Sequence, residues 1–443
     1  MIHVLDEAEA QQSILSRLAN ARIETDRLFE IVKPESLYAR PIRERHRIIF
    51  YLGHLEAFDW NLLRDRLLKL SSFEDSFDRL FAFGIDPVDG GLPSDQPSDW
   101  PSAAEIARYN RRIRESIDSR LESLPFANGA GNVEGADFSL LLNVAIEHRL
   151  MHAETLAYLL HQLPLDQKLA PPPDEAITAP PVEARMIEIR TGEATLGLAR
   201  SSGAFGWDNE FDLNRADVPA FEIDACKVTN GEFLRFVSDG GYRNPAFWSG
   251  EDWKWIAEGQ IACPAFWRRS GETWLCRNMF AEIPLPLGWP VYVSHAEAAA
   301  YARWAGKKLP SEAQWHRAAY GAPEGRERDY PWGDRLAEDQ GNFDFRRWDP
   351  VPVNADPAGR SAFGVEGMLG NGWEWTSSTF EPFPGFQPFP FYPGYSANFF
   401  DGEHYVMKGG SARTAACMLR RTFRNWFQPH YPYIYAAFRC VND

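Results

Sequence analysis

The stretch EHRLMHAE at residues 147–154 places two imidazoles four residues apart in a helix-forming segment. Positions i and i+4 of an α-helix lie on one face about one turn apart, so His148 and His152 can bind one metal ion together. The flanking runs, LLLNVAI at 140–146 and LAYLL at 156–160, are too apolar for a solvated surface. The sequence therefore predicts a buried helix with a metal-binding pair on one face.

A third imidazole is available in another apolar segment, IIFYLGHLE at residues 48–56, which carries His54. This segment also has the composition of a buried helix, and facing helices build metal sites in the cores of bundles. The remaining histidines stand alone and are expected to be structural or surface groups. From the residues alone, packed core histidines are an equally good interpretation of the pattern.

Composition limits the class of protein. A chain of 443 residues exceeds what one hydrophobic core usually supports, so we expect two domains. The formal net charge of −16 disfavours nucleic acid or an anionic membrane as a partner. No apolar run approaches the roughly 20 residues of a membrane span, and the N-terminus lacks a signal-peptide pattern. The expectation is a soluble, cytoplasmic protein.

The secondary-structure pattern of the sequence changes at a proline-rich segment. Before it, four long helical patterns without strand signals predict a four-helix bundle over residues 1–164. The patterns cover residues 8–32, 42–70, 103–124 and 138–163. Residues 165–185 are expected to form a stiff linker. Residues 186–443 predict an irregular α+β domain with short strands. Its clearest strands are 186–190 and 220–224, and its clearest helices are 230–238 and 294–305.

The second domain carries several motifs in an order typical of one known fold. They are CKVTNGEF at 226–233, AAYARWAGKKLPSEAQW at 299–315, GNGWEWT at 370–376, KGGS at 408–411 and FRC at 438–440. Together they resemble the formylglycine-generating-enzyme/sulfatase-modifying-factor domain, a variant of the C-type lectin fold. The fold alone does not determine function. The reactive cysteine pair that true formylglycine-generating enzymes carry shortly after KGGS is absent, since Cys417 is the only cysteine in that stretch, so peptide cysteine oxidation is not expected.

The combination of both domains resembles a more specific family. A DinB-like bundle with an HxxxHxE pattern, fused to this second domain, resembles the sulfoxide synthases of the ergothioneine pathway. The resemblance implies that His54, His148 and His152 hold Fe(II) and leave positions for a thiolate and O2. It implies an O2-dependent bond between the imidazole carbon of hercynine, the trimethylated betaine of histidine, and a thiol or selenol donor. Met151, beside His152, is expected to face the substrate pocket.

The resemblance also assigns residues in the second domain. FYPGYS at 391–396 lies where the family has its proton-donating tyrosine, so Tyr392 is expected to be catalytic and Tyr395 to line the substrate pocket. The Asn-Trp element that holds the betaine corresponds to Asn425 and Trp426. A quaternary ammonium cannot donate a hydrogen bond, and an indole face offers the strongest cation–π contact.

Three positions depart from relatives that use γ-glutamylcysteine. Trp100 and Ala103 replace two arginines, and Phe427 replaces an aspartate. Each lost charge-assisted contact is worth roughly 1.5–3 kcal/mol, so γ-glutamylcysteine is not the expected donor. Two donors remain open. One is free cysteine, whose carboxylate would be held by a guanidinium. The other is a selenosugar, as in the related selenoneine synthases, which would stack on Trp100 and Phe427. The candidate guanidiniums are Arg413, Arg420, Arg421 and Arg424.

Two alternatives from other classes also remain open. Three histidines suit zinc with one open position, as in a zinc-dependent thiol transferase of the bundle's wider family. The chain could also be a metal-stabilised binding module without oxygen chemistry.

Overall fold

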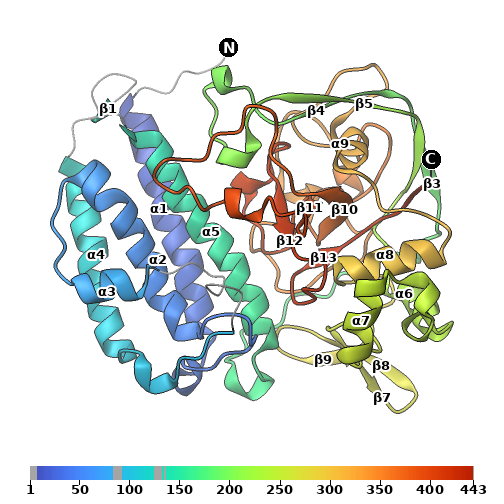
Figure 1. Cartoon of the computed structure of the whole chain (residues 1–443), viewed down its shortest axis with the longest axis horizontal. Coiled ribbons are helices and arrows are strands. Elements are labelled where there is room, and N and C mark those ends of the chain that lie inside the picture. The colour runs from blue at the N-terminus through green and yellow to red at the C-terminus, as the bar shows by residue number, and fades with distance from the viewer. Residues whose placement is uncertain (1–6, 83–91, 124–131, 134–135, 443) are drawn as a thin grey trace. The chain divides into compact units, whose positions relative to one another are not determined.

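The computed structural model describes residues 7–82, 92–123, 132–133 and 136–442 (Figure 1). The chain divides into two compact units, Met1–Pro172 and Pro173–Asp443. The boundary between them lies within the segment expected to be a linker, residues 165–185. Each unit has its own fold.

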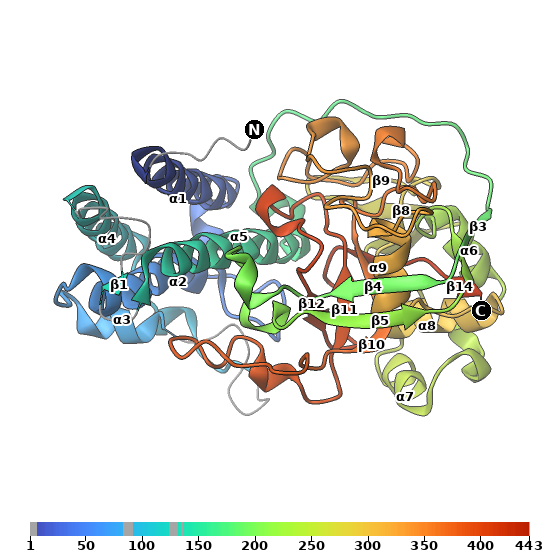
Figure 2. The same ribbon diagram turned by 90° about the horizontal axis from the view of Figure 1, so that it is seen from above.

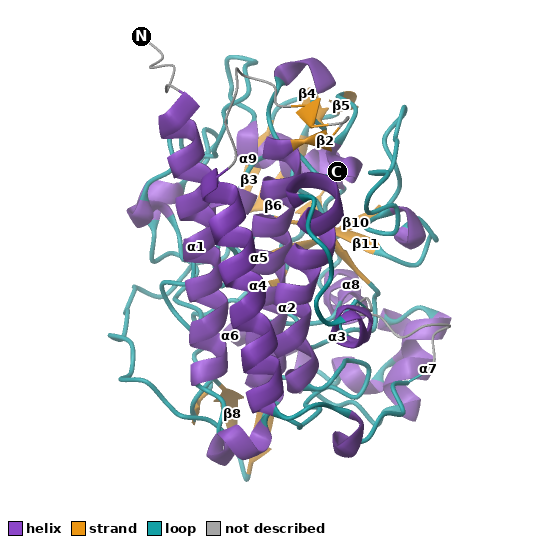
Figure 3. Ribbon diagram, turned by 90° about the vertical axis from the view of Figure 1, so that its left-hand side faces the viewer, coloured by secondary structure: helices purple, strands orange, loops and turns teal. Residues whose placement is uncertain are grey.

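The first unit is a helical bundle (Figure 3). Its helices are α1 (Glu7–Glu30), α2 (Ile48–Leu63), α3 (Asp75–Leu80), α4 (Ala103–Ser123) and α5 (Phe138–Gln162), with a π-helical turn, η2 (Arg64–Leu68), after α2. A short antiparallel pair, β1 (Asn132–Val133) and β2 (Ala136–Asp137), precedes α5. α5 packs against α1 and α2, and α2 packs against α4. The four long helices predicted from the sequence are confirmed.

The burial of these helices follows their patterning. α2 and α5 are buried on nearly every side and lie in the core, as expected for helices rich in apolar residues all round, although each also buries charged side chains. α4 is amphipathic and buries one stripe at helical spacing. That stripe consists of Ile106, Tyr109, Ile113, Ile117 and Leu121.

The helix boundaries of the first unit differ in detail from the sequence prediction. α2 begins at Ile48 rather than at residue 42, because the preceding segment folds back and the Ile48 N–H donates to the Ala39 carbonyl at 3.1 Å. Lys69, with a φ of 52°, ends the helical run just after η2. The six-residue helix α3 was not predicted, since it is too short to show a helical period.

The second unit contains four small sheets. Their strands are β3 (Met186–Ile189), β4 (Gly192–Leu196), β5 (Asn214–Val218), β6 (Phe221–Asp224), β7 (Trp267–Ser270), β8 (Thr273–Arg277), β9 (Glu282–Pro284), β10 (Trp373–Thr379), β11 (Tyr405–Lys408), β12 (Asn425–Phe427), β13 (Ala436–Ala437) and β14 (Val441–Asn442). The strand orders are β12-β11-β10-β13, β14-β6-β3, β4-β5 and β7-β8-β9. All pairs are antiparallel except β10 with β13. Figure 2 shows the long β4-β5 ribbon beside α9.

Four α-helices lie in the described part of this unit. They are α6 (Asn230–Ser238), α7 (Gly250–Glu258), α8 (His295–Trp304) and α9 (Glu312–Tyr320). The predicted helices at 230–238 and 294–305 are confirmed, whereas α7 and α9 were missed. A signal for α9 was present, because Ser311 and Gln314 form a capping box at its start.

The motifs of the second unit meet at one buried carboxylate. Glu374 on β10 accepts hydrogen bonds from Arg439 (2.6 and 2.8 Å) and from Trp315 Nε1 (3.0 Å), and lies 3.0 Å from Lys227 Nζ. Burial raises the pKa of Glu374, but Arg439 and Lys227 outweigh burial and lower it. Residues from four separate motifs therefore build a structural core.

None of the helices in the described ranges has both the length and the apolar character required to cross a bilayer.

Candidate functional site

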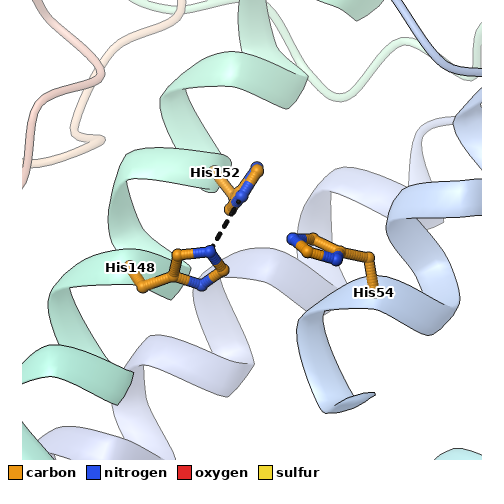
Figure 4. Close-up of side chains that lie close together, drawn as sticks. All are labelled: His54, His148 and His152. Carbon is orange, nitrogen blue, oxygen red and sulfur yellow. Dashed lines mark hydrogen bonds between the residues drawn. The ribbon is translucent and has the colours of Figure 1, made fainter. Parts of the chain in front are cut away.

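Three histidines converge in the first unit (Figure 4). His54 lies on α2, and His148 and His152 lie one turn apart on α5. One nitrogen of each ring lies within 4.8 Å of the other two, and the Nε2 atoms of His148 and His152 are 3.2 Å apart. All three side chains are buried. Within the described residues, no other group of three or more His, Cys, Asp or Glu side chains has such geometry.

The backbone at the end of α3 orients His54. Its Nδ1 lies 2.7 Å from the carbonyl oxygen of Phe81. A carbonyl can only accept a hydrogen bond, so Nδ1 carries the hydrogen and Nε2 keeps its lone pair. Figure 4 shows the far side of this ring turned toward His148 and His152. Metal-ligating histidines are commonly oriented by such a hydrogen bond.

The histidines are neutral in this environment. Burial lowers the pKa of His54 to about 4 and lowers the pKa values of His148 and His152 well below the usual range. Neutral imidazole is the form that binds a metal. Aromatic rings enclose the group, since Phe50 stacks on His54 at 4.8 Å and Phe58 stacks on His148 at 3.3 Å between ring centroids.

A buried ion-pair network fixes α2 against α5 beside these histidines. Arg149, completely buried, donates to Asp59 (2.6 and 3.2 Å) and to Glu56 (2.9 Å) on α2. Arg114 of α4 also donates to Glu56 at 2.6 Å. Burial raises the pKa of Glu56, but the two arginines outweigh burial and hold it at about 2. The network therefore sets the register that brings His54 opposite His148.

This donor set fits a divalent transition metal. Three neutral imidazoles from two fixed helices supply nitrogen ligands of the kind that Fe(II) and Zn(II) both accept, and they leave coordination positions for other ligands.

Tyr395 and Trp426 belong to one aromatic cluster of the second unit, and Asn425 lies next to Trp426 on β12. Trp426, on β12, stacks on Phe380 with centroids 4.1 Å apart and planes 6° apart. Tyr395 is buried, stacks on Trp207 at 3.9 Å and meets Trp426 edge-on at 5.4 Å. The side-chain oxygen of Asn425 accepts from the Trp426 N–H at 2.9 Å.

Tyr392 lies at the edge of the same cluster. Its ring centroid is 5.7 Å from that of Tyr395, and its side chain is only half-buried. Phe427, the last residue of β12, stacks on Tyr431 at 5.4 Å.

Trp100 and Met151 lie in the first unit. The Trp100 ring is 5.9 Å from Phe50, the residue stacked on His54, and its indole N–H donates to Asp95 at 2.8 Å. Met151 is half-buried on α5, next to His152.

Known proteins resemble this chain over both units. Residues 174–443 match the Sulfatase-modifying factor enzyme 1-like domain family, and residues 17–156 match the DinB superfamily. The hercynine oxygenase of Mycolicibacterium thermoresistibile is 36% identical over 77% of this chain and 75% of that protein. The hercynine oxygenase of Mycolicibacterium smegmatis is 33% identical over 98% of this chain and 99% of that protein.

The chain belongs to the hercynine oxygenase family. A fungal relative, Ergothioneine biosynthesis protein 1 of Neurospora crassa, is 28% identical over 94% of this chain but is matched over only 56% of its own length.

In this member of the hercynine oxygenase family, the arginines considered for a substrate carboxylate already have protein partners. Arg420 donates to Glu210 (2.8 Å), Arg424 donates to Glu312 (3.0 and 3.1 Å), and Arg421 donates to Glu327 (3.1 Å). Arg413 donates to the Phe345 carbonyl at 2.8 Å. Three of these guanidiniums are therefore paired with a carboxylate of the protein itself, and the fourth is bonded to a backbone carbonyl.

The contacts of several residues with the histidines were not predicted from the sequence. Phe50 and Phe58 looked like ordinary core residues, and nothing distinguished Phe81. Arg149 offered a signal, because a charge inside the apolar run at 140–160 is expensive unless it is paired.

Proposed function

We propose that this protein is a non-heme Fe(II), O2-dependent enzyme of ergothioneine-type biosynthesis that joins the imidazole carbon of hercynine to a sulfur or selenium donor. One observation carries the proposal. A hercynine oxygenase family chain brings three buried, neutral imidazoles together with their ligand nitrogens within 4.8 Å. His54, His148 and His152 would hold the iron. When bound, iron would supply the binding and reduction of O2 and a position for the donor's thiolate.

The overall reaction with a thiol balances. The imidazole C–H and the donor S–H each lose hydrogen, a carbon–sulfur bond forms, and the sulfur takes one oxygen atom. The second oxygen atom leaves as water with both hydrogens. The four electrons removed from carbon and sulfur are those that O2 accepts.

Hercynine is assigned to the aromatic cluster of the second unit. Trp426 and Tyr395 meet edge to face at 5.4 Å, and electron-rich ring faces attract a quaternary ammonium. The side-chain oxygen of Asn425 accepts the Trp426 N–H, and its amide nitrogen is the end that can donate to the betaine carboxylate.

Tyr392 is assigned as the proton donor. Its half-buried position contrasts with that of Tyr395, which is buried between Trp207 and Trp426. A phenol at the edge of the cluster can exchange its proton with solvent between turnovers, whereas the buried Tyr395 is assigned to binding hercynine through its ring.

The donor is assigned as one that does not depend on a guanidinium. The arginines after KGGS are paired with Glu210, Glu312 and Glu327 or with a backbone carbonyl. The Phe427 ring stacks on the Tyr431 ring. This supports a donor other than γ-glutamylcysteine and favours a group that stacks on rings, such as a selenosugar, over free cysteine.

The test is turnover of anaerobically iron-loaded protein with hercynine and O2, offering cysteine, γ-glutamylcysteine and a selenosugar in parallel. Product mass identifies the adduct. We expect one donor to dominate, Tyr392→Phe to lower turnover by about 10²–10⁴-fold and the matched Tyr395→Phe to lower it less. Absence of any adduct from iron-loaded protein would refute the proposal, and a zinc-loaded protein active without O2 would replace it with a thiol transferase.

A further inference from the structure

One carboxylate of α3 is hydrogen-bonded to several other elements of the bundle. Asp78 is buried and accepts four hydrogen bonds from side chains. Tyr109 on α4 donates at 2.6 Å, Arg64 at 2.7 Å, Ser72 at 2.7 Å and Trp60 on α2 at 3.1 Å. The donors come from α2, η2, α4 and the loop before α3. A six-residue helix has little stability of its own, so these bonds help to hold α3 in place, together with the Asn61 amide, which donates to the Asp78 main-chain carbonyl at 3.1 Å, and the contact of Phe77 with Tyr109.

The position of α3 matters because of the residue that follows it. The Phe81 N–H donates to the Phe77 carbonyl at 3.0 Å, which makes Phe81 a rigid continuation of α3. The Phe81 carbonyl then accepts the Nδ1 hydrogen of His54 at 2.7 Å. Asp78 lies three residues before Phe81, less than one turn away.

The fit between α3 and α2 is close. A Cβ atom added to Gly53 would lie 2.5 Å from the ring of Phe81, so only glycine allows this ring to approach α2 next to His54. Phe81 is completely buried and also contacts Phe50 and Trp100. A displacement of α3 would therefore change the position of both the ring and the carbonyl.

We propose that Asp78 is a positioning residue for the metal centre. By holding α3, it places the Phe81 carbonyl so that His54 keeps its hydrogen on Nδ1 and turns Nε2 toward His148 and His152. The inference rests on the proposed function only in taking these three histidines as metal ligands.

The experiment compares Asp78→Asn with Asp65→Asn in the full chain. Asp65 is a matched control, because it also pairs with Arg64, at 2.8 Å, but its side chain is 60% exposed and it makes no contact with α3 among the hydrogen bonds described. Three quantities are measured: the His54 tautomer in metal-free protein by ¹⁵N NMR, the affinity for Co(II) and Fe(II) by competition with a chelator, and urea unfolding.

We expect Asp78→Asn to lose the single Nδ1–H signature of His54 and to bind metal about 10–100-fold more weakly, with Asp65→Asn unchanged in both. A folded Asp78→Asn protein with the wild-type tautomer and affinity would overturn the inference. If Asp78→Asn does not fold, Tyr109→Phe is used instead, because it removes one hydrogen-bond donor to Asp78. The Tyr109→Phe variant must then change the His54 tautomer and the metal affinity in the same direction. If the wild type binds no metal, the proposed function fails, while the tautomer comparison still decides the role of Asp78.

Discussion

Replacement of Arg149 by methionine should destabilise the first unit by about 3–5 kcal/mol at pH 7, the usual cost of leaving a buried charge without its partner. Methionine fills a similar volume but supplies no donor. Glu56 would keep Arg114 at 2.6 Å. Asp59 would lose its partner at 2.6 Å, and among the described residues it has no second ion pair. The loss should therefore come mainly from Asp59.

The pH dependence separates this cause from loss of packing. Burial raises the pKa of Asp59 even with Arg149 in place. A carboxyl whose pKa is higher in the folded than in the unfolded state takes up a proton on folding, so lower pH favours the folded state. Without Arg149 that pKa should rise further. The difference between wild type and Arg149→Met should therefore shrink as the pH falls from 7 toward about 5.

The assay is urea unfolding of the whole metal-free chain, with hydrogen exchange of α2 and α5 amides reporting on the first unit alone. Arg27→Met is the matched control, because Arg27 pairs with Glu24 at 2.6 Å but is 63% exposed, and it should cost under about 0.5 kcal/mol. A loss below about 1 kcal/mol for Arg149→Met, or an equal loss at both pH values, would refute the reasoning.

Three further predictions concern single sites. Gly53→Ala should destabilise the bundle by about 1–3 kcal/mol, because its Cβ would lie 2.5 Å from the Phe81 ring, and thermal unfolding measures this. His152→Ala should weaken metal binding by more than the roughly 10–100-fold typical of residues that only support a ligand, as determined by metal content after dialysis at graded metal concentrations. Thr229→Ala should cost about 1 kcal/mol in urea unfolding, because the Thr229 hydroxyl accepts the Glu232 N–H at the start of α6.

The parts of this molecule that were predictable from sequence are those that depend on local spacing. His148 and His152 share a helix, and a run of apolar residues around them indicates burial. The second unit was predictable because the residues that meet at Glu374 belong to sequence motifs, and these motifs occur in a characteristic order along the chain. These features require no knowledge of which helix lies beside which.

The parts that were not predictable depend on tertiary contacts. That His54 meets the other two histidines was expected only from the family resemblance, because no local pattern encodes the packing of α2 on α5. The hydrogen bond from His54 to Phe81 depends on α3, whose six residues show no period. Trp100 was expected to offer a stacking surface, but its ring lies 5.9 Å from that of Phe50, a contact between segments fifty residues apart in sequence.

The strand order of the second unit has a consequence for its synthesis. β6 pairs on one edge with β3, which is made before it, and on the other with β14, more than two hundred residues later. At typical rates of 5–20 residues per second, the ribosome needs roughly 10–40 s to make the intervening chain. During that time the second edge of β6 has no native partner, although the helices of the first unit have all been made. A nascent chain stalled before residue 441 would therefore carry a finished bundle and an open sheet edge, the kind of surface that chaperones protect from aggregation.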